Sequence, residues 1–401
     1  MKCRLLLSGI SLFITLLSYG QEYNAGPFGK GVLNLMGQDS TWSMKFGMRM
    51  QFLSTARWDR EDDGGLINPS SAMLIRRARL KFDGFAFTPK LKYKIELGLS
   101  NRDIAGQSEF TRNAPRYILD AVVKWNFYEK FVLWAGQTKL PGNIERVISS
   151  GNLQLVDRSI VNALFNIDRD IGLQLRHSTQ ITDKFLTREI FAFSQGEGRN
   201  VVTGNIGGHQ YTFRLEMLPF GTFAKKGDYL GADLYREPKP KLLLAASYDI
   251  NDNAVRTRSN LGNFMFNDVG LYETTIRTLF VDTHFKYRGF SLMGEYANRE
   301  AEDPIAKNSD GSPTGDIVQV GDGFNLQAGY LLKKNWEVAG RYSNTDLVES
   351  ITGVNQVTQY TLGLSKYFVG HKLKVQTDMS YFKIDGSADR VFYRLQMDLH
   401  F

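Results

Sequence analysis

Runs of about ten residues, in which apolar and polar side chains alternate strictly, recur from Trp42 to the end of the chain. In residues 42–52, for example, Trp, Met and Phe fill the even positions, whereas Lys45 and Arg49 stand among the odd ones. A period of two places successive side chains on opposite faces of a β-strand. Each run therefore predicts a strand with one apolar face and one wet face. Such runs repeated along a whole chain are hard to accommodate in a soluble sandwich.

The runs number about sixteen, and an even total suits a closed antiparallel barrel. The connections alternate between tight turns and long segments, as they do on the two rims of a transmembrane barrel. One connection, 219–240, breaks this alternation because it is long yet falls on the short-turn side. The fold class is therefore predicted as all-β, a transmembrane antiparallel β-barrel. Its predicted strands are 42–52, 74–86, 91–99, 117–127, 131–138, 170–178, 185–194, 209–218, 241–249, 275–287, 289–298, 322–331, 335–343, 357–367, 371–381 and 391–401.

The composition excludes a bundle of membrane-spanning helices. The 401 residues have a mean hydropathy of −0.28, whereas each spanning helix needs roughly 20 mostly apolar residues. The aromatic content of 12% is nevertheless high, with 27 Phe and 18 Tyr. A barrel reconciles the two values, because its outer face is apolar, its inner face is wet, and aromatic girdles mark both lipid–water interfaces.

The N-terminus predicts export from the cytoplasm. A basic start, Met1–Arg4, precedes the apolar stretch 5–17, and a cleavage position lies near Gly20. We expect a signal peptide at 1–20, a periplasmic N-terminal segment at 21–41 and the barrel at 42–401; a buried N-terminal helix is the alternative for the first stretch. Removal of Cys3 with the signal peptide would leave no cysteine for disulfides, zinc sites or thiol catalysis.

The predicted wet face is most basic in the first six strands. If the apolar set faces lipid, nine basic and three acidic side chains point inward there, whereas the later strands carry six of each. Lysine and arginine in a low-dielectric lumen favour anions. The alternative is that these charges pair with loop acids and only brace the barrel. The nine basic residues are Lys45, Arg49, Arg77, Arg79, Lys81, Lys92, Lys94, Lys124 and Arg176, and the three acidic ones are Asp83, Glu96 and Asp120.

The segment 139–169 lies on the long-loop side but is rich in aliphatic residues, among them Leu153, Leu155 and Phe165. An outward loop would not keep so many aliphatic side chains in water. We therefore expect it to fold back into the barrel and narrow the lumen. A subunit contact is the alternative. The candidate constriction residues are Arg146, Arg158 and Arg169.

Three stretches resemble the phosphate-selective porin O and P family of Gram-negative outer membranes: 42–51, 76–84, and 134–142 with its continuation to 175. The resemblance implies a sixteen-stranded barrel, a homotrimer, an inward third loop, and basic pore residues that concentrate phosphate or polyphosphate. It also implies contact with outer-membrane lipid and lipopolysaccharide. The basic residues on which the face analysis and the resemblance agree are Arg49, Arg77, Arg79, Lys81, Lys92 and Lys94. The six-to-six balance in the later strands departs from strict anion selectivity.

The C-terminal strand, Tyr393–Phe401, alternates and ends on an aromatic residue. It resembles the strand that bacterial barrel-assembly machinery reads; an ordinary amphipathic edge strand is the alternative. No nucleic-acid partner is expected.

Other functions find less support in the sequence. The five histidines form no constellation with a nucleophile motif, so no enzymatic activity and no catalytic residue are predicted. The acidic stretches 61–65 and 249–253 lack EF-hand spacing, so no metal site and no cofactor are predicted. The functional prediction is a water-filled, anion-favouring channel for passive diffusion of small solutes. A non-selective porin, or a receptor or adhesion barrel that binds a partner through its long loops, is the alternative.

Overall fold

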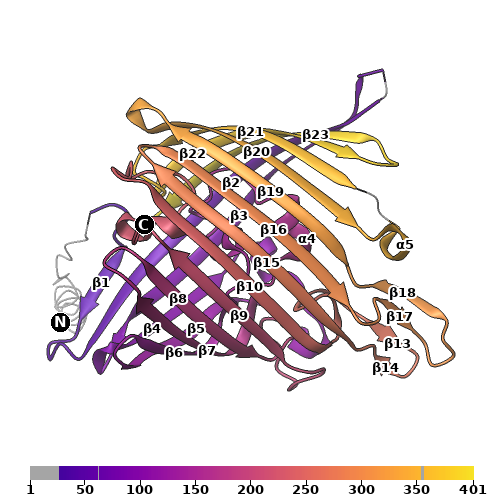
Figure 1. The fold of residues 1–401 in the computed structure, drawn as a ribbon, viewed down its shortest axis with the longest axis horizontal. Helices are drawn as coiled ribbons and strands as arrows, with labels where there is room; N and C mark the ends of the chain where they lie inside the picture. Colours follow the sequence, from indigo (N-terminus) through magenta and orange to yellow (C-terminus); the bar gives the residue numbers. More distant parts are fainter. Residues whose placement is uncertain (1–26, 62, 354–355) are drawn as a thin grey trace, which may run out of the picture.

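The computed structural model describes residues 27–61, 63–353 and 356–401, and within them sixteen antiparallel strands close into a barrel (Figure 1). Closure is made by β2 and β23, paired from Arg49 opposite His400 to Arg60 opposite Asp389. The predicted fold class is confirmed. The barrel strands are β2 (Trp42–Arg60), β3 (Leu66–Ala86), β4 (Thr88–Gly98), β5 (Ile118–Tyr128), β6 (Phe131–Lys139), β7 (Arg169–Gln180), β8 (Leu186–Ser194), β9 (Gln210–Leu218), β10 (Lys241–Ala254), β15 (Thr274–Tyr287), β16 (Phe290–Ala301), β19 (Gly321–Leu331), β20 (Trp336–Leu347), β21 (Val357–Tyr367), β22 (Leu373–Ile384) and β23 (Asp389–His400).

A seventeenth strand, β1 (Leu33–Met36), pairs with the first residues of β2, on the same edge where β23 pairs with the rest of β2. Leu33 pairs with Phe46 and Met36 with Ser43, and the Phe401 amide donates to the Met48 carbonyl just beyond them. Part of the expected N-terminal segment 21–41 therefore belongs to the sheet. The expected signal peptide, 1–20, lies outside the described residues.

The remaining elements are short. They are β11 (Arg256–Arg258), β12 (Leu261–Phe264), β13 (Phe266–Asn267), β14 (Gly270–Leu271), β17 (Ile305–Lys307), β18 (Pro313–Ile317), the helices α2 (Asn101–Ile104), α3 (Ile144–Val147), α4 (Ile160–Phe165) and α5 (Glu349–Thr352), and the 3-10 turns η1 (Glu109–Thr111), η2 (Ala224–Tyr229) and η3 (Lys333–Asn335).

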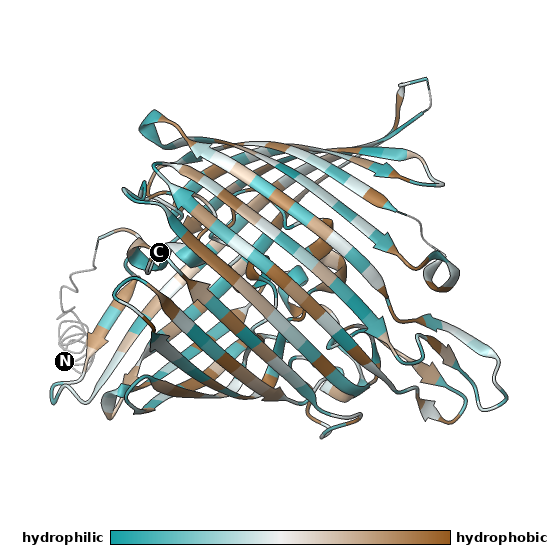
Figure 2. Cartoon of the chain, in the orientation of Figure 1, coloured by the Kyte–Doolittle hydropathy of each residue, from teal (hydrophilic) through white to brown (hydrophobic). Residues whose placement is uncertain are grey.

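The alternation of the sequence becomes two faces of the wall. On β15, Leu279 and Val281 are exposed on the outside, whereas Thr278, Asp282 and Lys286 are buried inside. Figure 2 shows this alternation as short bands of brown and teal along the strands. The pattern follows from the surroundings, because lipid offers no partner to a backbone N–H or C=O, and a closed sheet pairs them all internally. No helix in the described parts of the chain is both long enough and apolar enough to cross a bilayer.

One predicted loop is shorter than expected. The predicted strands 42–52 and 74–86 leave 53–73 as a long connection, but β2 continues to Arg60 and β3 begins at Leu66, so the hairpin projects beyond the rest of the barrel (Figure 1). The reason is that ladder hydrogen bonds come from the backbone and continue through side chains that are not apolar, as where Arg57 pairs with Ser70.

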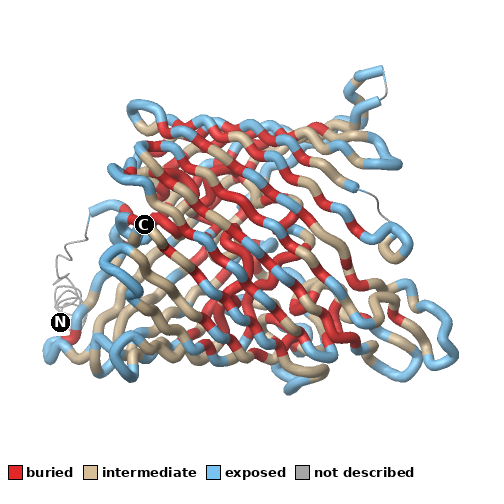
Figure 3. Tube along the Cα trace, in the orientation of Figure 1, coloured by how far each residue is buried: buried red, intermediate tan, exposed pale blue. Residues whose placement is uncertain are grey.

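The lumen is filled on one side only. The connection 140–168 enters from the long-loop rim, and Val161 and Phe165 of α4 pack with Phe280, Ala297 and Leu347 on the inner wall. Figure 3 and the burial of individual residues agree that β10, β15 and β16 alternate buried and exposed positions, whereas β4 is mostly intermediate or exposed. The inner face of the early strands therefore remains open.

Gly136 of β6 lies where the backbones of β5 and β6 leave no room for a Cβ atom. Its φ of +120° is unfavourable for other residues, and a Cβ there would lie 2.2 Å from the Ala121 carbonyl oxygen. We expect Gly136→Ala to lower the free energy of unfolding by about 1–3 kcal/mol. The measurement is denaturant unfolding of the barrel in lipid vesicles.

The matched control is Gly340→Ala on β20, where the added Cβ meets nothing closer than 3.9 Å. Equal losses in the two variants would contradict the strain assigned to Gly136.

Candidate functional site

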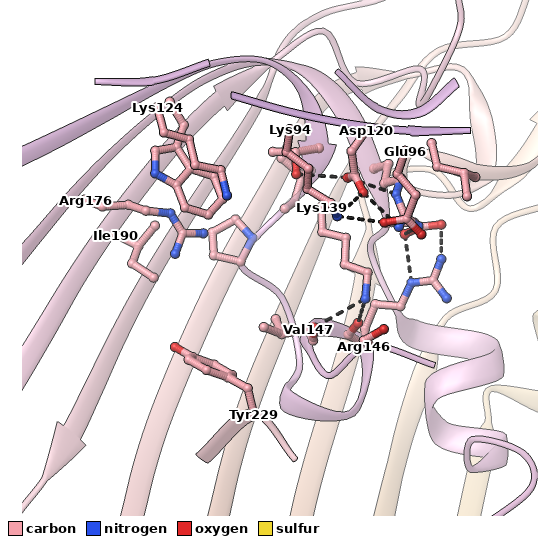
Figure 4. Close-up of a pocket in the computed structure, with 18 of the residues that line it drawn as sticks. Lys94, Glu96, Asp120, Lys124, Lys139, Arg146, Val147, Arg176, Ile190 and Tyr229 are labelled. Carbon is pink, nitrogen blue, oxygen red and sulfur yellow. Dashed lines mark hydrogen bonds and ion pairs between the residues drawn. The ribbon is translucent and has the colours of Figure 1, made fainter. Parts of the chain in front are cut away.

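A cavity of about 820 Å³ lies between the inner face of β3–β9 and the connection 140–168. Fifteen Lys and Arg side chains line it, against five Asp and Glu side chains. Figure 4 shows part of this lining, with Lys94, Lys124, Lys139, Arg146 and Arg176 around the space. The cavity is thus strongly electropositive, and it lies where the lumen is not filled.

Carboxylates neutralise one group of these cations. Glu96 and Asp120 lie opposite each other on β4 and β5. Lys94 Nζ lies 2.7 Å from Glu96 Oε2 and 2.6 Å from Asp120 Oδ2, and the Arg169 guanidinium lies 3.1 Å from Asp120 Oδ1. Arg79 completes the network with a contact of 2.9 Å to Glu96. These ion pairs tie β3, β4, β5 and β7 together.

A loop residue extends the same network. Asp103 of α2 accepts from Arg79 at 2.7 Å and from Arg77 at 3.2 Å. Arg49 stands apart from the cavity, where it contacts Asp398 at 3.1 Å and the Ser150 hydroxyl at 2.9 Å. Arg77 and Arg79 thus pair with a loop acid, as in the bracing alternative, whereas Arg49 and Lys94 pair with acids of the barrel strands.

Lys124 and Arg176 differ from that group because neither forms an ion pair with any described residue. Lys124 Nζ lies 3.6 Å from the ring centroid of Trp134, and the Arg176 guanidinium carbon lies 3.9 Å from it. Arg176 also donates to Gln174 Oε1 at 2.8 Å. The aromatic ring attracts both cations without cancelling their charge. In Figure 4 both residues lie on the same side of the cavity. Neither side chain has a carboxylate partner within the described ranges.

Lys81 and Lys92 do not line the cavity. Lys81 pairs with Asp83 at 2.8 Å and keeps 46% of its side chain exposed, and Lys92 is exposed as well. Both lie on the halves of β3 and β4 next to the turn at Phe87, at the short-turn rim. The structure therefore separates these two lysines from the predicted wall residues that line the cavity.

The three arginines predicted for the constriction meet at the cavity, each with a partner. Arg146 pairs with Asp168, its Nε lying 2.8 Å from Oδ1, and Arg169 pairs with Asp120. Arg158 instead donates to the backbone carbonyls of Glu145 and Ile148, at 2.7 and 2.8 Å. Burial lowers the pKa of Arg158 to about 10, against the opposing effect of the Glu145 carboxylate, so it stays charged at neutral pH.

Buried contacts fix the connection that carries these residues. The Ser159 hydroxyl caps α4 by accepting from the Asn162 amide at 3.1 Å. Glu145 accepts from Ser159 and pairs with Arg341 of β20 at 3.0 Å. A buried ion pair that loses one partner leaves an uncompensated charge, so this contact resists displacement. The connection is held against the wall opposite the cavity.

Arg76 has an inward role that the alternation of the sequence did not predict. A β-bulge shifts the register between Arg77 and Ile75, so that Arg76 is buried and pairs with Asp157. Arg76 also donates to the Val156 carbonyl at 2.8 Å. Burial alone would raise the pKa of Asp157, but the Arg76 and Arg394 guanidiniums hold it well below its usual range. Two adjacent arginines inside an alternating run were the available signal of a bulge.

Lys139 and Arg188 were also missed as lining residues. Lys139 Nζ donates to the Arg146 carbonyl at 2.6 Å and to two further carbonyls of the same connection. Arg188 points inward, with Glu216 at 3.1 Å, whereas its neighbour Glu189 points outward and contacts His177 at 3.0 Å. The sequence placed Lys139 in a loop, and the charged pair 188–189 left the parity of β8 ambiguous.

Asp282 and His284, on the inner face of β15, are both engaged in structural contacts. Asp282 pairs with Arg214 at 2.7 Å, and His284 Nδ1 lies 3.0 Å from the Asp228 carbonyl oxygen. Within the described ranges, no three His, Cys, Asp or Glu residues are grouped so that they could hold a metal ion.

Comparison with known proteins agrees with this geometry. The sequence profile of the phosphate-selective porin O and P family matches residues 46–391. An uncharacterised protein of Aquifex aeolicus is 24% identical over 361 residues, which cover 82% of this chain and 81% of that protein.

Solved structures share the fold at low sequence identity. An anion-selective porin from Comamonas acidovorans has a TM-score of 0.54 at 11% identity, covering 90% of this chain and 100% of its own. OprB of Pseudomonas putida has a TM-score of 0.54 at 10% identity, with 89% and 94% covered. The outer-membrane channel DcaP of Acinetobacter baumannii has a TM-score of 0.52 at 12% identity, with 91% and 99% covered.

The family and the fold point to a channel rather than to an enzyme. A closed transmembrane barrel with a polar, partly filled lumen is the structure that such a channel requires. The chain belongs to the phosphate-selective porin O and P family and is an outer-membrane porin.

Proposed function

We propose that this porin is an anion-favouring channel for passive diffusion of small solutes, with phosphate or polyphosphate as candidate substrates. The observation that carries the proposal is the pair Lys124 and Arg176, two cations on the indole of Trp134 that lack a carboxylate partner among the described residues. A mobile anion is the natural counterion of such a pair.

The position of the charges supports this proposal. On the filled side of the lumen, cations face acids: Arg341 pairs with Glu145 and Arg394 with Asp378. On the open side, fifteen basic residues face five acidic ones. Low-dielectric walls concentrate the field of fixed charges and raise the local concentration of the opposite ion. The excess positive charge thus lies beside the space through which ions would move.

Phosphate suits the site chemically. Guanidinium and ammonium groups both donate to phosphate oxygens, the first through a planar fork and the second as a point charge. Because Lys124 and Arg176 lie against the same indole, a tetrahedral oxyanion beside the ring could reach both. The name of the Comamonas acidovorans porin, anion-selective, agrees with the proposal.

Membership in the family supports further proposals on assembly and location. We propose that residues 1–20 are a signal peptide, that Tyr393–Phe401 engages the barrel-assembly machinery, and that the porin forms a homotrimer in contact with lipid and lipopolysaccharide. The aromatic and aliphatic outer face supports the lipid contact, because Leu362, Met379 and Tyr393 are exposed on the outside.

A non-selective porin is the second candidate. The observation that favours it is the pairing of Arg79, Lys94 and Arg169 with Glu96, Asp103 and Asp120, which removes several wall cations from the balance. Ion selectivity therefore separates the two candidates.

We expect the double variant Lys124→Gln, Arg176→Gln to lower the anion-to-cation permeability ratio by at least about twofold, because it removes two unpaired charges that concentrate anions. The measurement is the reversal potential of single channels in planar bilayers under a KCl gradient. The matched control, Lys333→Gln with Lys334→Gln, removes two exposed lysines from the η3 turn, outside the cavity. Cation preference in the wild-type channel, or an unchanged ratio in the double variant, would refute the proposal.

Phosphate tests the substrate class directly. We expect inorganic phosphate to reduce chloride current through the wild-type channel, because its oxygens would bind Lys124 and Arg176 in place of chloride. In the Lys124→Gln, Arg176→Gln variant the apparent affinity should fall at least about tenfold, equivalent to 1.4 kcal/mol. Titration of phosphate at constant chloride and ionic strength measures both values. Equal phosphate block in the two proteins would show that phosphate does not bind at Lys124 and Arg176.

A further inference from the structure

The connection 219–240 enters the barrel from the short-turn rim. It joins β9 to β10 where the other connections on this rim are tight, and its Phe223, Asp228 and Ala232 are almost fully buried. A surface loop would leave such residues in water. The connection thus occupies the lumen from the side opposite to 140–168.

Inner-wall side chains of β15 hold this connection through its backbone. Lys286 Nζ donates to the carbonyls of Gly227, Leu230 and Ala232 at 2.8, 2.8 and 2.7 Å. Asp233 accepts from the Gly289 amide at 2.7 Å. Three carbonyl contacts satisfy the three donors of a buried ammonium group. The connection is therefore fixed to the wall.

The connections 219–240 and 140–168 meet inside the lumen. Phe223 lies in one hydrophobic cluster with Ile144, Ile148 and Leu153 of the other connection. The Gly231 amide donates to the Asn152 carbonyl at 2.8 Å. One packed body thus joins two segments that enter from opposite rims.

Tyr229 and Lys226 bring this connection to the cavity lining. The Tyr229 hydroxyl donates to Glu216 Oε2 at 2.8 Å and accepts from Arg188 at 3.2 Å. Figure 4 shows Tyr229 across the space from Lys94 and Lys124, below Arg176 and Ile190. Lys226 is exposed and forms no ion pair with any residue in the described ranges.

We propose that the connection 219–240 is a second constriction element, in which Tyr229 limits the width of the anion route and Lys226 faces the ions that pass. The proposal rests on the channel function proposed above, and it assigns to this connection the control of size rather than of charge selectivity. The two functions have separate readouts, because conductance reports width and the reversal potential reports selectivity.

The first experiment removes the tyrosine ring. We expect Tyr229→Ala to raise single-channel conductance by at least about 1.3-fold, because conductance follows the open cross-section of a constriction. The matched control is Tyr235→Ala in the same connection, because Tyr235 is exposed outside the cavity against Lys225. Unchanged conductance in Tyr229→Ala, or an equal rise in the control, would overturn the proposal.

A second experiment retains the tyrosine and probes Lys226. The sequence contains one cysteine, Cys3, so Lys226→Cys in a Cys3→Ser background presents a single thiol. We expect a negatively charged methanethiosulfonate to reduce the current by at least about half, because it places a bulky anion in the route. The control is Lys184→Cys, an exposed lysine of the neighbouring turn that does not line the cavity. Full current after complete modification of Lys226→Cys would overturn the proposal.

The two proposals fail separately. If the wild-type channel shows no anion preference but Tyr229→Ala conducts more than Tyr235→Ala, the constriction stands and the anion function falls. If anion preference is present and both Tyr variants conduct like wild type, the anion function stands and the second constriction falls.

Discussion

The hydrogen bonding of the backbone in lipid is the constraint on which the rest of this structure depends. A strand that lacked a partner in the bilayer would leave a row of N–H and C=O groups without water or protein to bind, so β23 must return to β2. A closed sheet then has an inside and an outside along every strand. Apolar residues face lipid, and polar and charged residues face a lumen that has to be wet or internally paired.

The lumen satisfies its charges in two different ways. On one side, buried ion pairs such as Arg341 with Glu145 fix the connection 140–168 to the wall, and little space remains. On the other side, cations outnumber the available carboxylates, and Lys124 and Arg176 rest on an aromatic ring instead. Filling one half with a neutralised core thus concentrates the remaining positive charge in the other half, where solutes would pass.

The period of two predicted the strands and most lumen-facing residues, because it is a local property of the backbone. It failed at the bulge beside Arg77. An extra residue there turns Arg76 inward, and a strict alternation does not predict an extra residue. The partners of the charges were not predictable either. Arg49 pairs with Asp398 across the closing strands, and Arg79 pairs with Asp103 of a loop helix, so these contacts depend on closure and loop conformation. The unusual length of 219–240 was visible in the sequence, but its inward direction depends on Lys286 of a distant strand.

The off-centre position of the cavity has a consequence for how a channel of this kind can work. The connections 140–168 and 219–240 share one hydrophobic cluster, so neither can shift without disturbing the other. Their common body fixes the width of the route on one side, and the braced strands β3–β9 fix it on the other. A rigid route suits passive diffusion. Conduction also requires that ions bind weakly enough to leave. In the channel proposed above, cations without an ion pair, such as Lys124 and Arg176, stand beside paired ones, such as Arg79 and Lys94. Such a mixed wall meets that requirement better than a fully unpaired basic wall, which would hold a polyvalent anion too tightly to release it.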